Sequence, residues 1–179
     1  RMRTRDWFEA MLVGSVNAVG NVLARSFGDR DAFMKQMNQK ARQFHLRHTR
    51  FFDPTGLEIR NQATARDVAG LMQAALAYPD IRETTKKMSI HLVGRVNSKA
   101  YTLKSTNLLL SSFLNQAPYQ IDAAKTGSLP EAGFCLAQTT HDKNGHQIIV
   151  VVLGSENHFS RFQDAKTLTS WAFTNFEWH

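Results

Sequence analysis

The chain has 179 residues, of which 42% are hydrophobic and 21% charged, so a folded globular protein is expected and a disordered chain is excluded. The length suits one domain with its own core, and we expect a single domain over residues 1–179. The formal net charge is +7, but the 22 Lys and Arg are scattered along the sequence. Such scattering disfavours a nucleic-acid partner. It fits a solvated basic surface or weak attraction to an anionic polymer such as a cell wall.

The first half of the chain has the periodicity of helices. Asp6 and Glu9 have the spacing of a capping box, so a helix is expected to begin there. A second helix is predicted over residues 18–26, and a third is predicted to begin near Asp31. A cluster of helices is therefore expected on the N-terminal side of the fold.

A turn-rich stretch separates this cluster from the next helix. Residues 52–56 read Phe-Asp-Pro-Thr-Gly, a composition typical of turns. Thr64 is predicted to cap a helix and Pro79 to close it. The predicted apolar face of this helix carries Val68, Leu71, Met72, Ala75 and Leu76.

From residue 88 onward the pattern changes to strands. Residues 88–93 and 100–103 flank the turn-like segment 94–98 and predict a hairpin. A further strand is predicted over residues 121–127. It is expected to neighbour the strands that follow it in the chain.

A second hairpin is predicted from residues 133–141 and 146–153. The turn between them contains Asn144-Gly145, a strong hairpin signal. Cys135, the sole cysteine, lies in the first of these strands, so an internal disulfide is excluded and a buried small hydrophobe is expected there. The longest apolar stretch, residues 148–153, is too short to cross a bilayer.

A final helix completes the predicted order of elements. Ser160 and Gln163 have capping-box spacing and are expected to begin it. A helical cluster, an antiparallel sheet and a C-terminal helix packed on that sheet define an α/β fold of the α+β kind. No zinc-ligand spacing is present, and no metal or cofactor is predicted.

Two short motifs could supply chemistry. Ser15 and Asn17, two positions apart between predicted helices, can point into one cleft, although either could simply cap the following helix. Lys125-Thr126-Gly127 ends an apolar strand, where a cation, a hydroxyl and a residue without a side chain suit an anionic substrate laid along the strand edge. An ordinary strand end is the alternative for the second motif.

Arg161 is the third candidate. A cation in the first turn of a helix opposes the helix dipole, so helix stability does not explain its position. A guanidinium near a strand-edge site could clamp a carboxylate through two hydrogen bonds. A solvent-facing arginine is the alternative.

Taken together, the motifs resemble those of penicillin-binding proteins, whose set is S-x-x-K, S-x-N and K-T-G. The surrounding sequence is similar to the sequences of the low-molecular-weight D-alanyl-D-alanine carboxypeptidase family over nearly the whole chain. The matching segments are residues 5–17, 38–41, 49–57, 64–67, 105–109, 125–127, 131–136 and 151–154. This resemblance implies a β-lactamase/transpeptidase-like fold.

The resemblance also implies an acyl-enzyme mechanism and roles for the motif residues. Ser15 would pass a proton to the leaving D-alanine, and Asn17 would hold the substrate amide. Lys125 would polarise this network and attract the substrate carboxylate. The remaining implied substrate-binding residues are Thr126, Gly127, Ser128 (through its backbone N–H, as an oxyanion donor) and Arg161.

The chain departs from the family in three respects. No serine in it is followed by a lysine three residues later, so the S-x-x-K nucleophile and the first strands are expected to lie in an N-terminal segment that this chain lacks. Ala18 stands where the family usually has Asp, and Ser128 stands where a bulkier residue is common. The chain as given is therefore expected to be inactive alone.

Three functions remain open at this point. The first is a serine carboxypeptidase that cleaves the D-Ala-D-Ala end of peptidoglycan stem peptides, or a cross-link, and that binds β-lactams. The second is a non-catalytic wall-binding module without a nucleophile. A serine β-lactamase is a weaker third, because no E-x-x-L-N motif is present. The family works outside the cytoplasm, and any membrane association would need segments outside this chain.

The resemblance carries one structural expectation as well. In the family, the final strand of the sheet pairs with strands that precede the catalytic serine. Without them, residues 146–153 are expected to form an unpaired apolar edge. The isolated chain should then aggregate or dimerise through this strand, and Val151→Lys should reduce that association.

Overall fold

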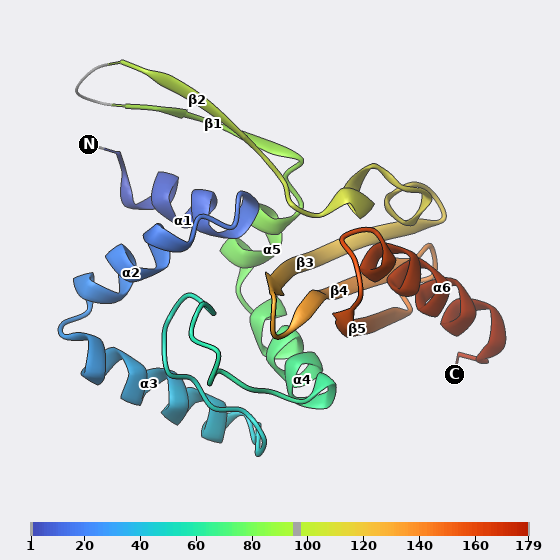
Figure 1. Ribbon diagram of the computed structural model, residues 1–179. Coiled ribbons are helices and arrows are strands. Elements are labelled where there is room, and N and C mark those ends of the chain that lie inside the picture. The colour runs from blue at the N-terminus through green and yellow to red at the C-terminus, as the bar shows by residue number, and fades with distance from the viewer. Residues whose placement is uncertain (1, 95–97, 179) are drawn as a thin grey trace.

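The helices of the first half of the chain lie on one side of the molecule, and the larger sheet lies on the other (Figure 1). The computed structural model describes residues 2–94 and 98–178. The helices are α1 (Thr4–Val13), α2 (Asn17–Ser26), α3 (Arg30–Gln43), α4 (Ala65–Leu76), α5 (Pro79–Thr85) and α6 (Ser160–Asn175), with the short 3₁₀ turns η1 (Leu108–Ser111) and η2 (Phe113–Asn115).

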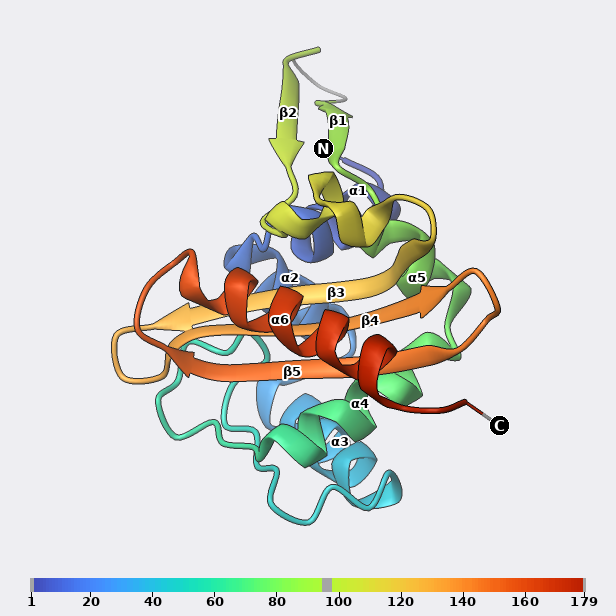
Figure 2. The same ribbon diagram turned by 90° about the vertical axis from the view of Figure 1, so that its right-hand side faces the viewer.

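Within the described residues the strands form two antiparallel sheets. The hairpin of β1 (Ser89–Val93) and β2 (Ala100–Lys104) projects beyond α1 (Figures 1 and 2). The larger sheet has the order β3-β4-β5, made of β3 (Tyr119–Leu129), β4 (Gly133–Asp142) and β5 (Gln147–Ser155). The predicted strands are confirmed, while residues 95–97 of the first predicted turn lie outside the described residues.

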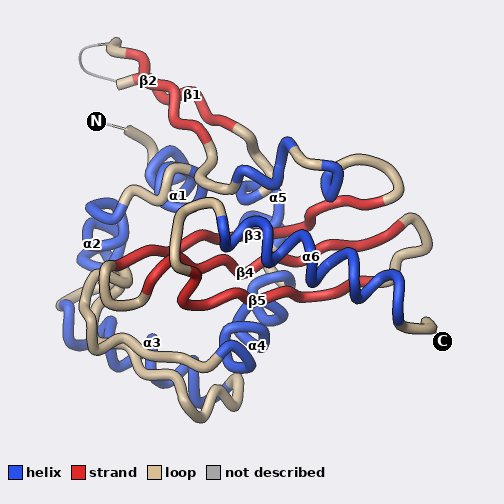
Figure 3. Tube along the Cα trace, turned by 45° about the vertical axis from the view of Figure 1, so that its right-hand side comes forward, coloured by secondary structure: helices blue, strands red, loops and turns tan. Residues whose placement is uncertain are grey.

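The larger sheet lies between two helical layers. Helix α6 crosses one face, and α4 and α5 pack on the other (Figures 2 and 3). This arrangement explains why β5 is apolar on both faces, since Val150 and Val152 pack toward α6 while Ile149 and Val151 pack toward α4. Val151→Lys would therefore place a charge against the α4 layer, so it is a poor variant for testing the edge of the sheet.

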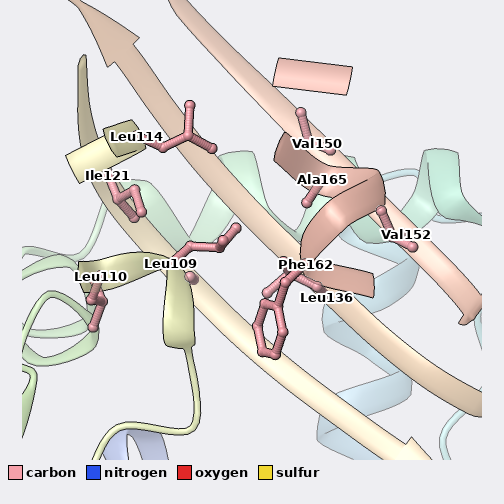
Figure 4. Packing of buried hydrophobic residues seen from close by; sticks show 10 residues of the cluster. Leu109, Leu110, Leu114, Ile121, Leu136, Val150, Val152, Phe162 and Ala165 are labelled. Atoms are coloured by element: carbon pink, nitrogen blue, oxygen red, sulfur yellow. The ribbon is translucent and has the colours of Figure 1, made fainter. Parts of the chain in front are cut away.

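The main core lies under α6 (Figure 4). Leu114 and Ile121 are fully buried, and Leu136 is nearly so. Phe162 and Ala165 of α6 belong to this cluster and cover it on the side of the helix. Burying each of the large side chains stabilises the fold by roughly 1.5–3 kcal/mol, which fixes α6 and β3 relative to each other.

A second core joins α1, α2 and β1. Its buried residues are Ala10, Val13, Val19, Ile90 and Leu92. Because the last residues of α1 and the start of α2 are both anchored here, the short connection between the two helices is held in place. That connection carries Ser15.

Several predicted helix boundaries are wrong in detail. Helix α1 begins at Thr4, and it is Asp6 that accepts a hydrogen bond from the Arg3 backbone, whereas Glu9 binds Lys87. A capping box built on Asp6 and Glu9 is therefore wrong. The long side chain of Glu9 reaches a lysine far away in the chain, a contact that local spacing cannot reveal.

The start of α6 also differs from expectation, whereas α4 ends at Leu76, before Pro79, as predicted. Ser160 does not cap α6; the Asn157 side chain accepts from the backbone N–H groups of Phe159 and Ser160 instead. Pro79 is the first residue of α5, a helix that the sequence did not predict. Proline suits that position because its missing N–H has no helical partner to lose there.

Candidate active site

The turn between α1 and α2 presents Ser15 to a cleft. Ser15 has a φ of +52°, in the left-handed region that is uncommon for residues other than glycine. The turn is held by backbone hydrogen bonds from Gly14 and Val16 to the carbonyl oxygen of Ala10. Strained residues of this kind cluster at functional sites, where the surrounding structure enforces them.

The end of β3 meets this turn through a direct contact. The Lys125 ammonium donates to Ser15 Oγ at 2.6 Å and to the Thr126 carbonyl oxygen at 2.9 Å. Ser15 and Lys125 are 110 positions apart in the chain, so the fold alone brings them together. The two sequence motifs therefore share one site.

The electrostatics of Lys125 follow from its surroundings. Burial, together with the nearby Arg161 charge, lowers the pKa of Lys125 to about 8. An ammonium with such a pKa stays mostly charged at neutral pH but gives up its proton more readily than an exposed lysine. It can both attract an anion and take part in proton transfer.

Arg161 is buried, so the alternative of a solvent-facing arginine is wrong. Its Nη1 donates to the carbonyl oxygens of Gly127, at 3.0 Å, and Cys135, at 3.4 Å, and thereby joins β3 and β4 to α6. The guanidinium also lies over the rings of Phe134 and Phe162, at 5.4 and 4.7 Å. Because Nη1 is occupied, Arg161 has fewer donors for a ligand than a free guanidinium.

The site has an excess of positive charge. Burial lowers the pKa of Arg161, which shows that the protein does not fully compensate its charge. Within residues 2–94 and 98–178, neither Lys125 nor Arg161 has a carboxylate partner in an ion pair. Two partly desolvated cations without an acidic partner favour an anionic ligand.

A cleft of about 780 Å³ gathers these groups. All the residues that sequence reasoning selected line it, namely Ser15, Asn17, Lys125, Thr126, Gly127, Ser128 and Arg161. Asn17, the first residue of α2, is exposed, and in the described part of the chain no protein group binds its amide. A Cβ added at Gly127 would lie 3.8 Å from the Cβ of Cys135, an ordinary van der Waals distance, so the fold itself does not require glycine there.

The loop that follows α3 forms one wall of the cleft. Residues 54–57 line the cleft, and Asp53 holds the loop by accepting hydrogen bonds from Thr55, Asn61 and the backbone of Gly56. Burial alone would raise the pKa of Asp53, but these hydrogen bonds outweigh it and lower the pKa to about 2. The wall is therefore built around a carboxylate that stays ionised.

Thr106 and His158 are among the cleft-lining residues that sequence reasoning missed. The Thr106 hydroxyl lies 2.6 Å from the Thr126 hydroxyl, and His158 Nδ1 lies 3.0 Å from Arg161 Nη2. Thr106 belongs to a segment that resembles the family, which was a usable signal. His158 is in a connecting loop and has no pattern around it.

Cys135 differs from expectation because it is half-buried rather than fully buried. Its Sγ lies 3.6 Å from the Ala132 carbonyl oxygen, next to the turn that joins β3 to β4. In the described ranges no group of three or more His, Cys, Asp or Glu could hold a metal ion. No helix among the described residues has the length and apolar character to cross a membrane.

This fold is similar to that of solved penicillin-binding proteins. A Streptomyces DD-transpeptidase matches with a TM-score of 0.84 and 26% identity, over 95% of this chain and 67% of the transpeptidase. A penicillin-binding protein of Listeria monocytogenes in its cefotaxime-bound form matches with a TM-score of 0.80 and 29% identity, over 95% of this chain and 66% of that protein. Fold and cleft thus define a chain of the penicillin-binding, DD-peptidase class.

Sequence comparison narrows this class. A family model described as D-alanyl-D-alanine carboxypeptidase matches residues 1–157, and the chain belongs to this family. A D-alanyl-D-alanine endopeptidase of Pseudomonas aeruginosa is 32% identical over 95% of this chain and 54% of the relative. A D-alanyl-D-alanine carboxypeptidase of Bacillus subtilis is 28% identical over 99% of this chain and 44% of the relative. The chain spans about half the length of the curated relatives it matches.

Proposed function

We propose that this chain forms the carboxylate-binding and proton-relay part of a serine-type D-Ala-D-Ala carboxypeptidase that acts on peptidoglycan stem peptides. The observation that carries the proposal is the hydrogen bond of 2.6 Å from Lys125 to Ser15, which joins the S-x-N turn and the K-T-G strand in one cleft. Family membership supports the same reaction.

The proposed chemistry assigns each group a task. The terminal carboxylate of the peptide enters the field of Lys125 and Arg161 and accepts a hydrogen bond from Thr126. The Asn17 amide holds a substrate amide, and the backbone N–H of Ser128 faces the oxygen that becomes negative in the tetrahedral intermediate. Gly127 leaves the strand edge beside them open.

The covalent step needs a nucleophile from S-x-x-K, which these 179 residues do not contain. Its serine oxygen bonds to the carbonyl carbon of the penultimate D-alanine, and the peptide C–N bond breaks. Ser15, held by Lys125, relays a proton to the departing amine. Water then hydrolyses the ester and releases the shortened peptide.

A binding experiment tests this assignment on the chain itself. A peptide ending in D-Ala-D-Ala, titrated into ¹⁵N-labelled chain, should shift the backbone signals of Lys125, Thr126 and Gly127. Lys125→Met should weaken binding roughly 10- to 100-fold, because a charge-assisted hydrogen bond is lost. Shifts confined to residues far from the cleft, or equal binding of the L-Ala-L-Ala peptide, would contradict the proposal.

A labelling experiment tests the covalent step. The 179-residue chain should form no adduct with a fluorescent penicillin, because it has no serine beside a lysine in S-x-x-K spacing. Joining it to an N-terminal segment that carries S-x-x-K should restore labelling, and Lys125→Ala should then weaken it. Strong labelling of the chain alone would mean that another serine is the nucleophile.

A non-catalytic wall-binding module is the second candidate, since the cleft could bind a peptide without a nucleophile beside it. It would bind the same peptides without cleaving them. The chain joined to an N-terminal S-x-x-K segment distinguishes the carboxypeptidase from the wall-binding module. It should release D-alanine from the peptide only if Ser15 and Lys125 can relay the proton. In both cases we propose an extracytoplasmic location in a bacterium, where peptidoglycan and β-lactams are encountered.

A further inference from the structure

Thr106 connects the two halves of the cleft. It lies between β2 and η1, and its backbone N–H donates to the carbonyl oxygen of Val13, the last residue of α1, at 3.2 Å. Its hydroxyl lies 2.6 Å from the hydroxyl of Thr126 on β3. One residue thus contacts both the helix that leads to Ser15 and the strand that carries the K-T-G motif.

The neighbours of Thr106 hold it firmly. Asn107 is buried; its Nδ2 donates to Gln138 Oε1 at 3.3 Å, and its Oδ1 accepts from the Leu109 backbone at 3.1 Å. The backbone N–H of Asn107 also donates to Ser105 Oγ. These contacts fix the backbone on the C-terminal side of Thr106, while the bond to Val13 fixes Thr106 itself. The Thr106 hydroxyl therefore has a defined position beside Thr126.

The chemistry of a carboxylate sets the direction of this hydrogen bond. A hydroxyl has one proton, and a carboxylate can only accept. If Thr126 donates to a ligand carboxylate, its proton is not available to Thr106. The proton in the contact of 2.6 Å must then come from Thr106. Donation from Thr106 also polarises the Thr126 hydroxyl and makes it a better donor.

We propose that Thr106 is a positioning residue that orients the Thr126 hydroxyl toward the terminal carboxylate of the ligand. In this way it favours peptides with a free C-terminal carboxylate over peptides whose C-terminus is blocked. The inference rests on the proposed function and deepens it, because it assigns the recognition of that carboxylate to a pair of hydroxyl groups.

Matched variants and matched ligands test this role. Thr106→Val removes the hydroxyl at nearly constant volume, and Thr106→Ser keeps it. Each chain is titrated by NMR with a peptide ending in D-Ala-D-Ala and with the same peptide as its C-terminal amide. Thr106→Val should weaken binding of the acid roughly 3- to 10-fold, the effect of one neutral hydrogen bond, and leave binding of the amide unchanged. Thr106→Ser should bind the acid like the original chain.

The possible results separate the inference from the function on which it rests. Equal weakening of acid and amide by Thr106→Val would show a purely structural role and overturn the inference, as would no effect on either. If the unaltered chain does not prefer the acid, the proposed function itself fails. Thr106→Ala, which removes the hydroxyl without adding bulk, replaces the valine variant if that variant does not fold.

A double-mutant cycle adds a measurement that a purely structural role of Thr106 would not affect, namely the coupling of the two hydroxyls in the preference for the acid peptide. If the two hydroxyls act in series, Thr126→Val alone should remove most of the preference for the acid. Thr106→Val should then have no further effect on that preference. Independent, additive losses in the two variants would overturn the proposed hydroxyl pair.

Discussion

The two outer edges of the larger sheet are used in different ways. The β3 edge carries Lys125 and Thr126, and α1 and the Thr106 segment approach it. The β5 edge has no charged residue over Gln147–Ser155. An apolar groove runs beside it, lined by Ile148, Ile149, Val150, Val151, Leu168, Trp171, Ala172, Phe176 and Trp178.

This difference shows what turns a strand edge into a ligand site. An edge strand offers backbone donors and acceptors, and by themselves these invite pairing with any extended chain. At the β3 edge, we propose that Lys125, Arg161 and the threonine hydroxyls restrict the ligand to an anionic peptide. At the β5 edge nothing in the described residues imposes such a restriction, so the same backbone groups favour unspecific pairing.

The largest effect is expected at Arg161, which joins the β3 edge to α6. Arg161→Ala leaves the carbonyl oxygens of Gly127 and Cys135 without this donor. We expect a loss of about 3 kcal/mol in the free energy of unfolding, measured by urea denaturation. The exposed Arg66→Ala serves as control and should change stability by less than about 0.5 kcal/mol. A similarly small change for Arg161→Ala would mean that neither its hydrogen bonds nor its contacts with Phe134 and Phe162 fix the strand end.

Asp53 tests the loop that forms one wall of the cleft. Asp53→Asn removes the ionised acceptor of the loop, and we expect a loss of about 2 kcal/mol at pH 7. The folded pKa of about 2 lies below the ordinary aspartate value of 3.8, so the stabilisation by Asp53 is present above pH 4 and is lost as the pH falls toward 2. The difference between the two chains should therefore shrink between pH 4 and 2. A constant difference would contradict the role of the charge.

Sequence patterns located the β3 edge well because its signals are local. Lys125-Thr126-Gly127 is contiguous, and Asn144-Gly145 marks the second hairpin, where Gly145 has a φ of +87°. The apolar run of β5 was also recognised. Its burial between α4 and α6 was not, because an uninterrupted apolar strand does not reveal what covers each face.

Contacts between distant segments could not be predicted in the same way. Thr106 meets Thr126 only after η1 and η2 turn the chain back onto the sheet. Arg161 was selected for its odd place in a helix, and its bonds to Gly127 and Cys135 depend on the register of β3 and β4. Such contacts are set by tertiary packing, for which spacing along the chain has no signal.

The pH dependence of Lys125 gives a smaller effect at the β3 edge. Its pKa of about 8 means that the ammonium loses its charge as the pH rises from 7 to 9, and affinity for the acid peptide should fall up to about tenfold. Lys125→Met should bind weakly at every pH. Between pH 8 and the ordinary lysine pKa of 10.5 the unfolded chain binds more protons than the folded chain, so the contribution of Lys125 to stability rises with pH. Affinity that is flat from pH 7 to 9 would contradict the lowered pKa.

The smallest effect is expected at the β5 edge, and it concerns association rather than folding. Leu153 is 43% exposed on this strand, outside the apolar clusters on either face, so Leu153→Lys adds a charge without disturbing the core. If two chains pair through β5, both copies bring the new charge into one interface, and each like-charge or desolvation penalty there amounts to about 1 kcal/mol. Sedimentation of the unaltered chain should show concentration-dependent dimers or aggregates, and Leu153→Lys should weaken this association roughly fivefold.

Two further variants serve as controls. Leu153→Ala, which adds no charge, should weaken the association less than Leu153→Lys. Val151→Lys should lower the stability of the fold, because residue 151 contacts the α4 layer. A monodisperse, cooperatively melting monomer for the unaltered chain would show that the β5 edge is protected after all, and the contrast between the two edges would then rest on the ligand site alone.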